Sequence, residues 1–220
     1  MSGLFITFEG IDGCGKTTQR RLTAEWLSDQ GREVLETFEP GDTALGREIR
    51  GLLLGGAHVP APETELMLFL ADRTQHVREL ILPALKRGAV VLCDRYTDST
   101  RAYQLAGRAL DDGTDREGRD GLNRNHLEAM LDIAELGATP DVTLWFDVPV
   151  EAAFERMRAR AAEGEKASRF DAEKQAFHQR VREGFSAIHA AQPQRVQHVD
   201  AGMDVQAVQA EVRRLLSEHL

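Results

Sequence analysis

The residues with the clearest chemical potential lie near the N-terminus, where residues 10–17 read Gly-Ile-Asp-Gly-Cys-Gly-Lys-Thr. Their spacing, G-x-x-x-x-G-K-T, is that of a phosphate-binding loop. Glycines let backbone N–H groups close around phosphate oxygens, and the start of a helix adds partial positive charge. We expect Lys16 to neutralise phosphate charge and the Thr17 hydroxyl to ligate magnesium. The residues assigned to phosphate binding are Gly10, Ile11, Asp12, Gly13, Cys14, Gly15, Lys16, Thr17 and Thr18.

The flanks of this loop have the order that the motif requires. Residues 4–8 form an apolar, β-prone run that suits a buried strand. Residues 18–30 place Leu22, Trp26 and Leu27 at roughly helical spacing. A strand, a glycine-rich turn and a helix in succession favour a true phosphate loop over a chance match.

A second candidate follows another apolar run, residues 89–93, which is predicted to be a strand buried on both faces. Ligands of open α/β sheets collect at the carboxyl ends of the strands. Asp94, at that end, is expected to hold magnesium opposite Thr17, directly or through water. Arg95 follows and is expected to clamp another phosphate. The alternative is a helix-capping aspartate beside a surface arginine.

A third group consists of five cations, Arg156, Arg158, Arg160, Lys166 and Arg169. Arg156 and Arg160 share one face of a predicted helix because they are four residues apart. We expect the group to form a lid, at about residues 150–171, with one arginine supplying charge to a transition state. The same pattern also fits an exposed helix face paired with neighbouring glutamates.

Phe69 and Arg73 lie one turn apart on a predicted helix and face the same way. An aromatic ring beside a guanidinium can stack on a nucleobase and hydrogen-bond it. The alternative is core packing for Phe69 and a surface position for Arg73. The seven histidines are scattered without metal-ligand spacing.

Strands alternate with helices along the chain. Strands are expected at residues 4–8, 33–38, 89–93, 142–146 and 196–199. Helices are expected at residues 18–30, 45–54, 63–86, 98–106, 122–136, 150–162, 170–190 and 205–216. This alternation predicts an α/β fold, a three-layer sandwich around a five-stranded, mainly parallel sheet, in a single domain over residues 1–220. Pro83 is expected to kink or divide its helix, and the acidic stretch 111–121 to be a solvated, mobile loop.

Composition narrows the classes of function. A net charge of −9 argues against broad binding to a nucleic acid polymer or an anionic membrane. No apolar run approaches the length of a membrane span, and nothing resembles a signal peptide. The two cysteines, Cys14 and Cys93, lie in the phosphate loop and a predicted core strand. Reduced thiols in those places suit a cytoplasmic protein.

Several segments together resemble the bacterial type of the thymidylate kinase family. Residues 8–18 match the opening of that family, and the Glu-Pro-Gly of residues 39–41 matches its second-strand motif. Residues 94–104 resemble its D-R-Y-x-x-S-x-x-A-Y-Q segment, which is highly specific. Pro140-Asp141, the arginine-rich lid and Arg169-Phe170-Asp171 also fit the family pattern.

The resemblance implies a P-loop nucleoside monophosphate kinase-like fold and transfer of the ATP γ-phosphate to dTMP, which gives dTDP and ADP. It also implies a magnesium requirement and a homodimer. The dTMP-binding residues that it implies are Asp12, Arg50, Phe69, Arg73, Arg95, Ser99, Tyr103 and Gln104. Within this set, Phe69 would stack on thymine and Arg73 would bond the base.

The same resemblance gives roles to the remaining residues of this set. Arg95, together with Arg50, would hold the dTMP phosphate. Asp12 would meet the 3′-hydroxyl of the sugar. Tyr103 would crowd the 2′ position and disfavour a ribonucleotide, and Gln104 would lie near the base or sugar.

On the ATP side, Asp200, Ala201 and Gly202 fall where related kinases pass a loop beside adenine. Gly13 occupies the place near which some family members carry an arginine, so its presence fits the class that supplies this arginine from the lid. The expected catalytic residues are Lys16, Arg95 and one of Arg156 and Arg160, supported by Arg158 and Arg169.

Two departures from the family pattern stand out. Phe38 and Asp42 occupy positions where the family usually has arginine and glycine, and the acidic stretch 111–121 is longer than expected. Two other functions stay open: a P-loop kinase for another nucleoside monophosphate or a deoxynucleoside, and a nucleotide-dependent switch without kinase activity.

Overall fold

The computed structural model describes residues 3–55, 59–110, 112–114, 120–162, 170 and 173–220. Its main sheet consists of β1 (Leu4–Glu9), β2 (Val34–Phe38), β3 (Val90–Asp94), β6 (Val142–Asp147) and β7 (Val196–Asp200). The strands lie in the order β2-β3-β1-β6-β7, and every pairing is parallel. The five-stranded sheet is therefore confirmed, and it is wholly parallel.

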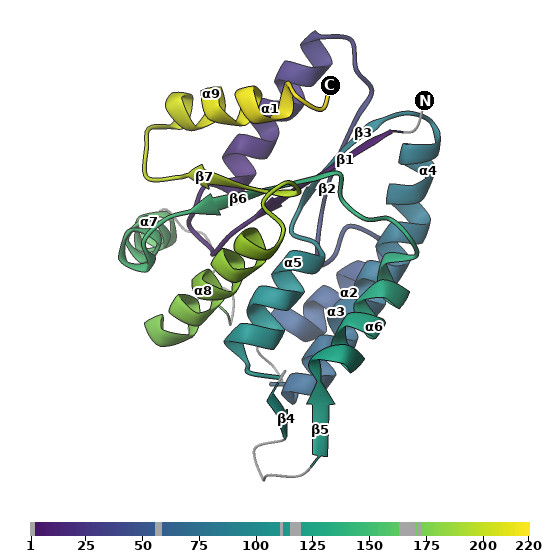
Figure 1. The fold of residues 1–220 in the computed structure, drawn as a ribbon, viewed down its shortest axis with the longest axis vertical. Helices are drawn as coiled ribbons and strands as arrows, with labels where there is room; N and C mark the ends of the chain where they lie inside the picture. The colour runs from purple at the N-terminus through teal and green to yellow at the C-terminus, as the bar shows by residue number, and fades with distance from the viewer. Residues whose placement is uncertain (1–2, 56–58, 111, 115–119, 163–169, 171–172) are drawn as a thin grey trace.

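Helices cover both faces of this sheet (Figure 1). On one face, α1 (Lys16–Asp29) packs against α9 (Val205–Leu216). On the other face lie α4 (Leu82–Lys86), α5 (Thr97–Thr100) and α8 (Gln175–Ala191). The three-layer α/β sandwich that the alternating pattern predicts is confirmed.

The remaining helices extend the second layer. α2 (Ala44–Leu54), α3 (Pro62–His76) and α6 (Arg124–Glu135) pack in succession, and α7 (Val150–Ala162) packs against α8 (Figure 1). Thr43 starts α2 by accepting the Gly46 N–H at 2.9 Å. Among the helices of the described part, none combines the length and apolar character that a membrane span needs.

The helix predicted over residues 63–86 is continuous but changes type. α3 runs into a π-helical segment, η1 (Val77–Ile81), which α4 continues. The N–H of Leu82 donates to the carbonyl of Val77, five residues back. This wider turn immediately precedes Pro83, which has no N–H to donate and whose ring crowds a regular helix. A second π-helical segment, η2 (Arg101–Gly107), continues α5.

The acidic stretch contains secondary structure that the sequence did not predict. β4 (Asp112–Thr114) and β5 (Asp120–Asn123) pair as an antiparallel hairpin, so α6 begins at residue 124 rather than 122. The loop prediction is wrong for these strands, because strand pairing uses backbone groups that an acidic composition does not report. Residues 111 and 115–119 lie outside the described residues.

The start of the helix predicted over residues 170–190 is also wrong. α8 begins at residue 175, because Lys174 is extended with φ −67° and ψ 151°. Phe170 instead enters an aromatic group, with its ring centroid 5.9 Å from that of Tyr103 and 6.5 Å from that of Phe177. Aromatic packing therefore holds this residue against η2 and α8.

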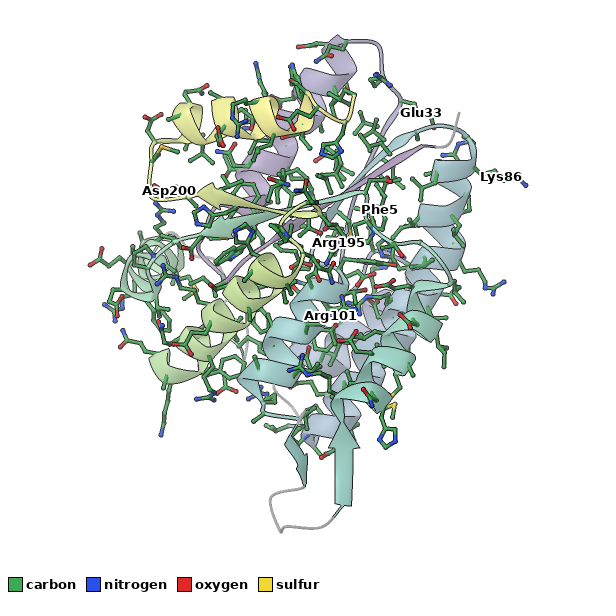
Figure 2. The ribbon with its side chains drawn as sticks, viewed as in Figure 1. Phe5, Glu33, Lys86, Arg101, Arg195 and Asp200 are labelled. Atoms are coloured by element: carbon green, nitrogen blue, oxygen red, sulfur yellow. The ribbon has the colours of Figure 1, made fainter. Side chains whose placement is uncertain are left out.

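A buried carboxylate ties the second helical layer together. Asp98, at 2% exposure, accepts from Arg195 at 2.7 Å and from Arg101 at 3.1 Å. Figure 2 shows both arginines directed to the same region beneath the sheet. These bonds join the start of α5 to the loop before β7, and so fix the segment that follows β3.

Candidate active site

The phosphate loop connects β1 to α1 at the carboxyl end of the central strand. Gly10 and Gly13 have φ values of +139° and +84°, which strain any residue with a Cβ. A Cβ at Gly10 would lie 2.5 Å from the Phe146 carbonyl oxygen, and one at Gly13 would lie 2.5 Å from that of Ala153. Glycine is therefore required for the loop to pass this close to the backbone of β6 and α7.

Lys16 is the first residue of α1 and is only 6% exposed. Its Nζ atom donates to the carbonyl oxygens of Gly10 at 3.1 Å and Ile11 at 3.2 Å. The ammonium group is thus held at the loop by two of the loop's own carbonyls. A phosphate bound in this loop would meet a positive charge that is already in position.

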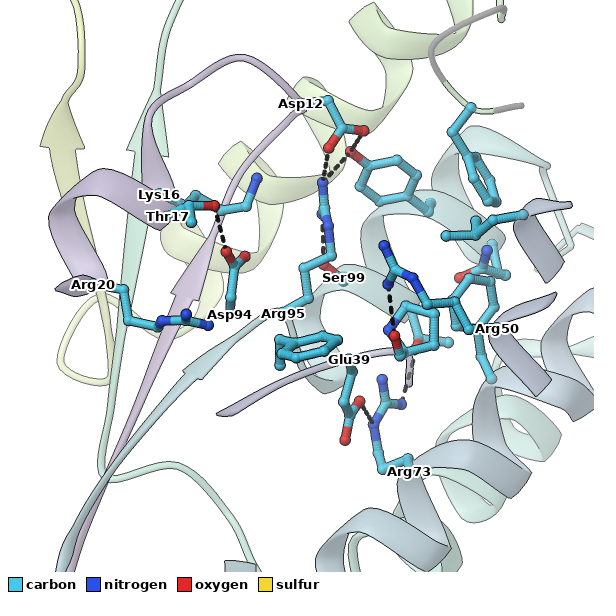
Figure 3. A pocket seen from close by; sticks show the side chains of 18 residues that line it. Asp12, Lys16, Thr17, Arg20, Glu39, Arg50, Arg73, Asp94, Arg95 and Ser99 are labelled. Carbon is cyan, nitrogen blue, oxygen red and sulfur yellow. Dashed lines mark hydrogen bonds and ion pairs between the residues drawn. The ribbon is translucent and has the colours of Figure 1, made fainter. Parts of the chain in front are cut away.

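Thr17 and Asp94 meet as the sequence predicts. The Thr17 hydroxyl donates to Oδ2 of Asp94 at 2.9 Å (Figure 3). Asp94 is not a helix cap, since α5 has no side-chain cap. A hydroxyl and a carboxylate oxygen suit magnesium. No group of three or more His, Cys, Asp or Glu side chains within the described residues is arranged to hold a metal. The pair therefore fits a magnesium ion that takes its other ligands from phosphate and water.

Arg95 is built into the floor of the site. Its φ is +69°, and its side chain is 17% exposed, so the surface alternative is wrong. Nη1 donates to Gly10 O at 3.1 Å and to Ser99 Oγ at 3.0 Å. Nη2 donates to Asp12 Oδ1 at 2.7 Å and to Tyr103 OH at 3.0 Å. The guanidinium group is therefore fixed by four hydrogen bonds between the phosphate loop and the helix after β3.

The charges of this cluster keep Asp12 ionised. Partial burial of the Asp12 carboxyl opposes ionisation, but the charges of Arg95 and Lys16 hold its pKa below the usual range. The site consequently presents a permanent carboxylate between two cations.

These residues surround a cavity of about 380 Å³ (Figure 3). Its volume lies in the range of small-molecule sites. Of the sequence-predicted residues, the cavity is lined by Asp12, Lys16, Thr17, Arg50, Phe69, Arg73, Asp94, Arg95, Ser99, Tyr103 and Gln104. The lining residues that received no role from the sequence are Arg20, Phe38, Glu39, Pro40, Leu54, Thr100 and Phe170. Every residue expected at dTMP therefore faces one cavity.

One wall of the cavity contains a buried charge pair. Arg73 is 1% exposed, so the surface alternative for it is wrong. Its Nε atom lies 2.9 Å from Glu39 Oε2, and Nη1 donates to Thr100 Oγ1 at 2.9 Å. His76 Nδ1 lies 2.8 Å from the other Glu39 oxygen. This pairing aligns Arg73 at the cavity wall, where Phe69 is also placed.

Arg20 lines the cavity although sequence reasoning gave it no role. Its Nη1 atom donates to Thr37 O at 2.8 Å, and its Nε atom lies 3.3 Å from Glu36 Oε2. A signal was available in the sequence, because Arg20 follows Lys16 by four residues on the same helix face. The structure thus adds a cation beside Asp94.

The arginines that the sequence predicts to form a lid are placed differently. Arg156 does not line the cavity; its Nη2 atom donates to the carbonyl oxygen of Ala201 at 3.0 Å. Gly202 N donates to Asp200 Oδ1 at 2.8 Å in the same loop. α7 and the loop expected beside adenine are therefore in contact. Arg158 is exposed. The Arg160 side chain, Lys166 and Arg169 lie outside the described part.

The fold and the site together define a class of protein. A parallel sheet in the order β2-β3-β1-β6-β7, with a phosphate loop after the central strand, is that of the P-loop nucleoside monophosphate kinases. Outside the phosphate loop, the cavity is lined by further cations, including Arg95, and a kinase of this class needs such a cation for its acceptor phosphate.

Comparisons with known proteins narrow the class further. The family model described as thymidylate kinase matches residues 8–212. A thymidylate kinase of Gloeobacter violaceus is 44% identical over 210 residues, which cover 96% of this chain and 92% of the relative. One of Pseudomonas fluorescens is 46% identical over 221 residues, covering 100% and 98%. The crystal structure of the Ehrlichia chaffeensis thymidylate kinase superposes with a TM-score of 0.75 at 32% identity, covering 99% of this chain and 100% of that one. The chain belongs to the thymidylate kinase family.

Proposed function

We propose that this protein transfers the γ-phosphate of ATP to dTMP and releases dTDP and ADP. The observation that carries the proposal is the shared cavity, which brings the phosphate-loop lysine together with all the residues expected at dTMP. Family membership over nearly the whole chain supports the same reaction.

The two substrates approach from opposite ends of the cavity. The ATP phosphates bind at the loop beside Lys16, and the dTMP phosphate binds Arg95. The thymine then reaches Phe69 and Arg73, and the sugar lies near Asp12. Because a phosphate oxygen of dTMP is already anionic and nucleophilic, no covalent enzyme intermediate is needed. The protein aligns two phosphates and offsets their repulsion.

Thr17 and Asp94 are the residues that would hold magnesium, which supplies charge neutralisation to the ATP phosphates when bound. The protein groups do the remaining work. Lys16 and Arg95 place positive charge on the two sides of the junction. Either Arg156 or Arg160 completes this charge from the lid when the donor is bound.

The protein is further proposed to act as a homodimer. Exposed apolar side chains on the adjoining helices α2, α3 and α6 support this, with Leu52 at 57%, Met67 at 50% and Ile133 at 71% exposure. Apolar side chains left exposed on neighbouring helices can be buried by association with a second copy of the chain. The cytoplasmic location expected from the cysteines stays a prediction.

The substrate assignment is tested by coupled ADP release with dTMP, dUMP, dCMP, dGMP and thymidine as acceptors. We expect dTMP to have the highest kcat/KM, because Phe69 and Arg73 are assigned to the thymine base and Arg95 to a phosphate that thymidine lacks. A higher kcat/KM for another acceptor would refute the assignment and support the alternative nucleotide kinase.

The nucleotide-dependent switch predicts a different outcome. It needs the phosphate loop but no acceptor pocket, so calorimetric titration of dTMP into nucleotide-free protein would release no heat. Because Arg95 and Arg73 face the same cavity, we expect saturable binding of one dTMP per chain.

A further inference from the structure

A buried carboxylate lies directly behind Arg95. Glu9 is the last residue of β1, and its side chain is 0% exposed. Oε1 accepts from the backbone N–H of Tyr96 at 2.7 Å and from that of Ser99 at 3.2 Å. Oε2 accepts from the Ser99 hydroxyl at 2.5 Å. One carboxylate therefore satisfies three donors of the segment that carries Arg95.

The Ser99 hydroxyl has only one proton, so its donor direction matters. When that proton points to Glu9, the lone pairs of Oγ are free to face Arg95, whose Nη1 donates to it at 3.0 Å. The order of donation is then Arg95 to Ser99 to Glu9. Glu9 thereby fixes the guanidinium group without touching the cavity, since it is absent from the residues that line it.

We propose that Glu9 is a positioning residue: as a carboxylate it orients the Ser99 hydroxyl and so holds Arg95 in place for the acceptor phosphate. This inference rests on the proposed function. A neutral Glu9 would donate its own proton to Ser99 and reverse the order of donation. The Ser99 proton would then lose Glu9 as its acceptor, which disfavours the arrangement that Arg95 needs.

The surroundings of Glu9 bring the protonation of its carboxylate close to neutral pH. Burial and the nearby Asp98 raise the pKa of Glu9 from 4.5 to about 7, against the lowering effect of the Ser99 hydrogen bond and the Arg95 charge. The Cys93 thiol of β3 also interacts with Glu9. Because the pKa in the folded protein is raised, the carboxylate is lost as pH falls through about 7.

The test uses the full chain and the substitution Glu9→Gln. The glutamine carbonyl can accept from the two backbone N–H groups, while its amide donates to Ser99 and imposes the reversed order at every pH. We expect KM for dTMP to rise about tenfold, the effect of one hydrogen bond to a charged group. KM for ATP should stay within about twofold, because Glu9 is hydrogen-bonded to Tyr96 and Ser99 and not to Lys16.

The pH profile supplies a readout that a merely structural role would not move. Wild-type kcat/KM for dTMP should fall as pH decreases from 8 to 6, through both Glu9 and the dTMP phosphate, which titrates near pH 6. Glu9→Gln should retain only the later, phosphate-dependent decline. The ratio of kcat/KM for Glu9→Gln to kcat/KM for the wild type should therefore rise as the pH falls.

Ser99→Ala gives an independent arm and covers a folding failure of the first variant. It removes the hydroxyl that links Arg95 to Glu9. It should therefore raise KM for dTMP and also remove the decline of kcat/KM near pH 7. The double variant should be no worse than the poorer single one, because both changes break one chain of hydrogen bonds. The proposal is overturned if either folded variant keeps the wild-type KM and pH profile, or if the two effects add. Absence of dTMP turnover in the wild type would instead refute the proposed function.

Discussion

Arg95 and Arg156 are both expected to face the transferred phosphate, yet the protein holds them in opposite ways. Arg95 makes four hydrogen bonds and sits over the Tyr103 ring with its Cζ atom 4.8 Å from the ring centroid. Arg156 lies on α7, and its contact within the described residues is one backbone carbonyl, that of Ala201. One cation is built into the fold, while the other lies outside the cavity.

This difference has a physical consequence. A cation whose position is fixed before substrate arrives needs no reorganisation during the reaction, so its full electrostatic effect reaches the transition state. A cation that must leave another partner delivers only the difference between two interactions. We therefore expect the acceptor side of the junction to depend on preorganisation and the donor side to depend on an exchange of contacts.

Removing the fixed cation should have the largest effect. Arg95→Ala deletes all four hydrogen bonds and leaves the Asp12 carboxylate without its main partner. We expect kcat/KM for dTMP to fall about 10²-fold or more, as removal of a preorganised charge commonly does. Lys16→Ala should lose a comparable factor from the donor side. Steady-state coupled assays measure both.

Arg95→Lys sharpens this prediction. It keeps the charge but loses the planar fork that reaches Gly10, Ser99, Asp12 and Tyr103 together. If positioning matters more than charge, this variant should resemble Arg95→Ala. Near-normal turnover by Arg95→Ala would contradict the acceptor-side role.

Substitution of Arg156 should have a smaller effect. We expect Arg156→Ala to lower kcat about tenfold with little change in KM for dTMP, because Arg156 is bound to Ala201 rather than to the cavity. Glu155→Ala, at an exposed neighbouring position of α7, is the matched control and should stay near wild type. A loss for Arg156→Ala as large as that for Arg95→Ala would show that the two sides do not differ as proposed. The same assay on Arg160→Ala decides which lid arginine is needed.

Parts of the candidate site also differ in how well the sequence predicted them. The phosphate loop and the Asp94–Thr17 contact follow from local order and strand topology, because parallel strands end at one edge. Arg73 was ambiguous by pattern, since helical spacing alone does not reveal that Glu39, from another element, pairs with it in the interior.

The hydrogen-bond partners of Glu9 could not be predicted from the sequence for the same reason. Glu9 could be seen as part of a motif, but its bonds to Tyr96 and Ser99 join residues some ninety positions apart. The hairpin of β4 and β5 was missed because acidic composition describes side chains and not backbone pairing. The Asp94–Thr17 contact also joins distant residues, but it follows from where parallel strands end; the partners of Arg73 and Glu9 follow from no such rule and had to come from the structure.

Arg20 is held less firmly than Arg95 but, unlike Arg156, lines the cavity. Its removal should have the smallest effect. It lines the cavity from α1, but Thr37 O and Glu36 already occupy two of its donors. The chain has Phe38 at the adjoining wall, where the family usually places an arginine. Positive charge at this wall therefore comes from Arg20 together with Arg50, whose guanidinium lies over the Phe38 ring. We expect Arg20→Ala to lower kcat/KM about threefold to fivefold, by the modest free energy of a partly exposed charge.

The double variant Arg20→Ala with Phe38→Arg makes that expectation specific. If Arg20 acts through its charge at this wall, an arginine at position 38 should restore most of the lost activity. Phe38→Arg alone should have little effect while Arg20 is present, apart from loss of the ring that the Arg50 guanidinium faces at 5.7 Å. Failure of the rescue, with Arg20→Ala still impaired, would place the role of Arg20 in its bond to Thr37 and thus in the position of β2. Arg20 would then belong with the positioning groups behind Arg95 and not with the cations that face substrate.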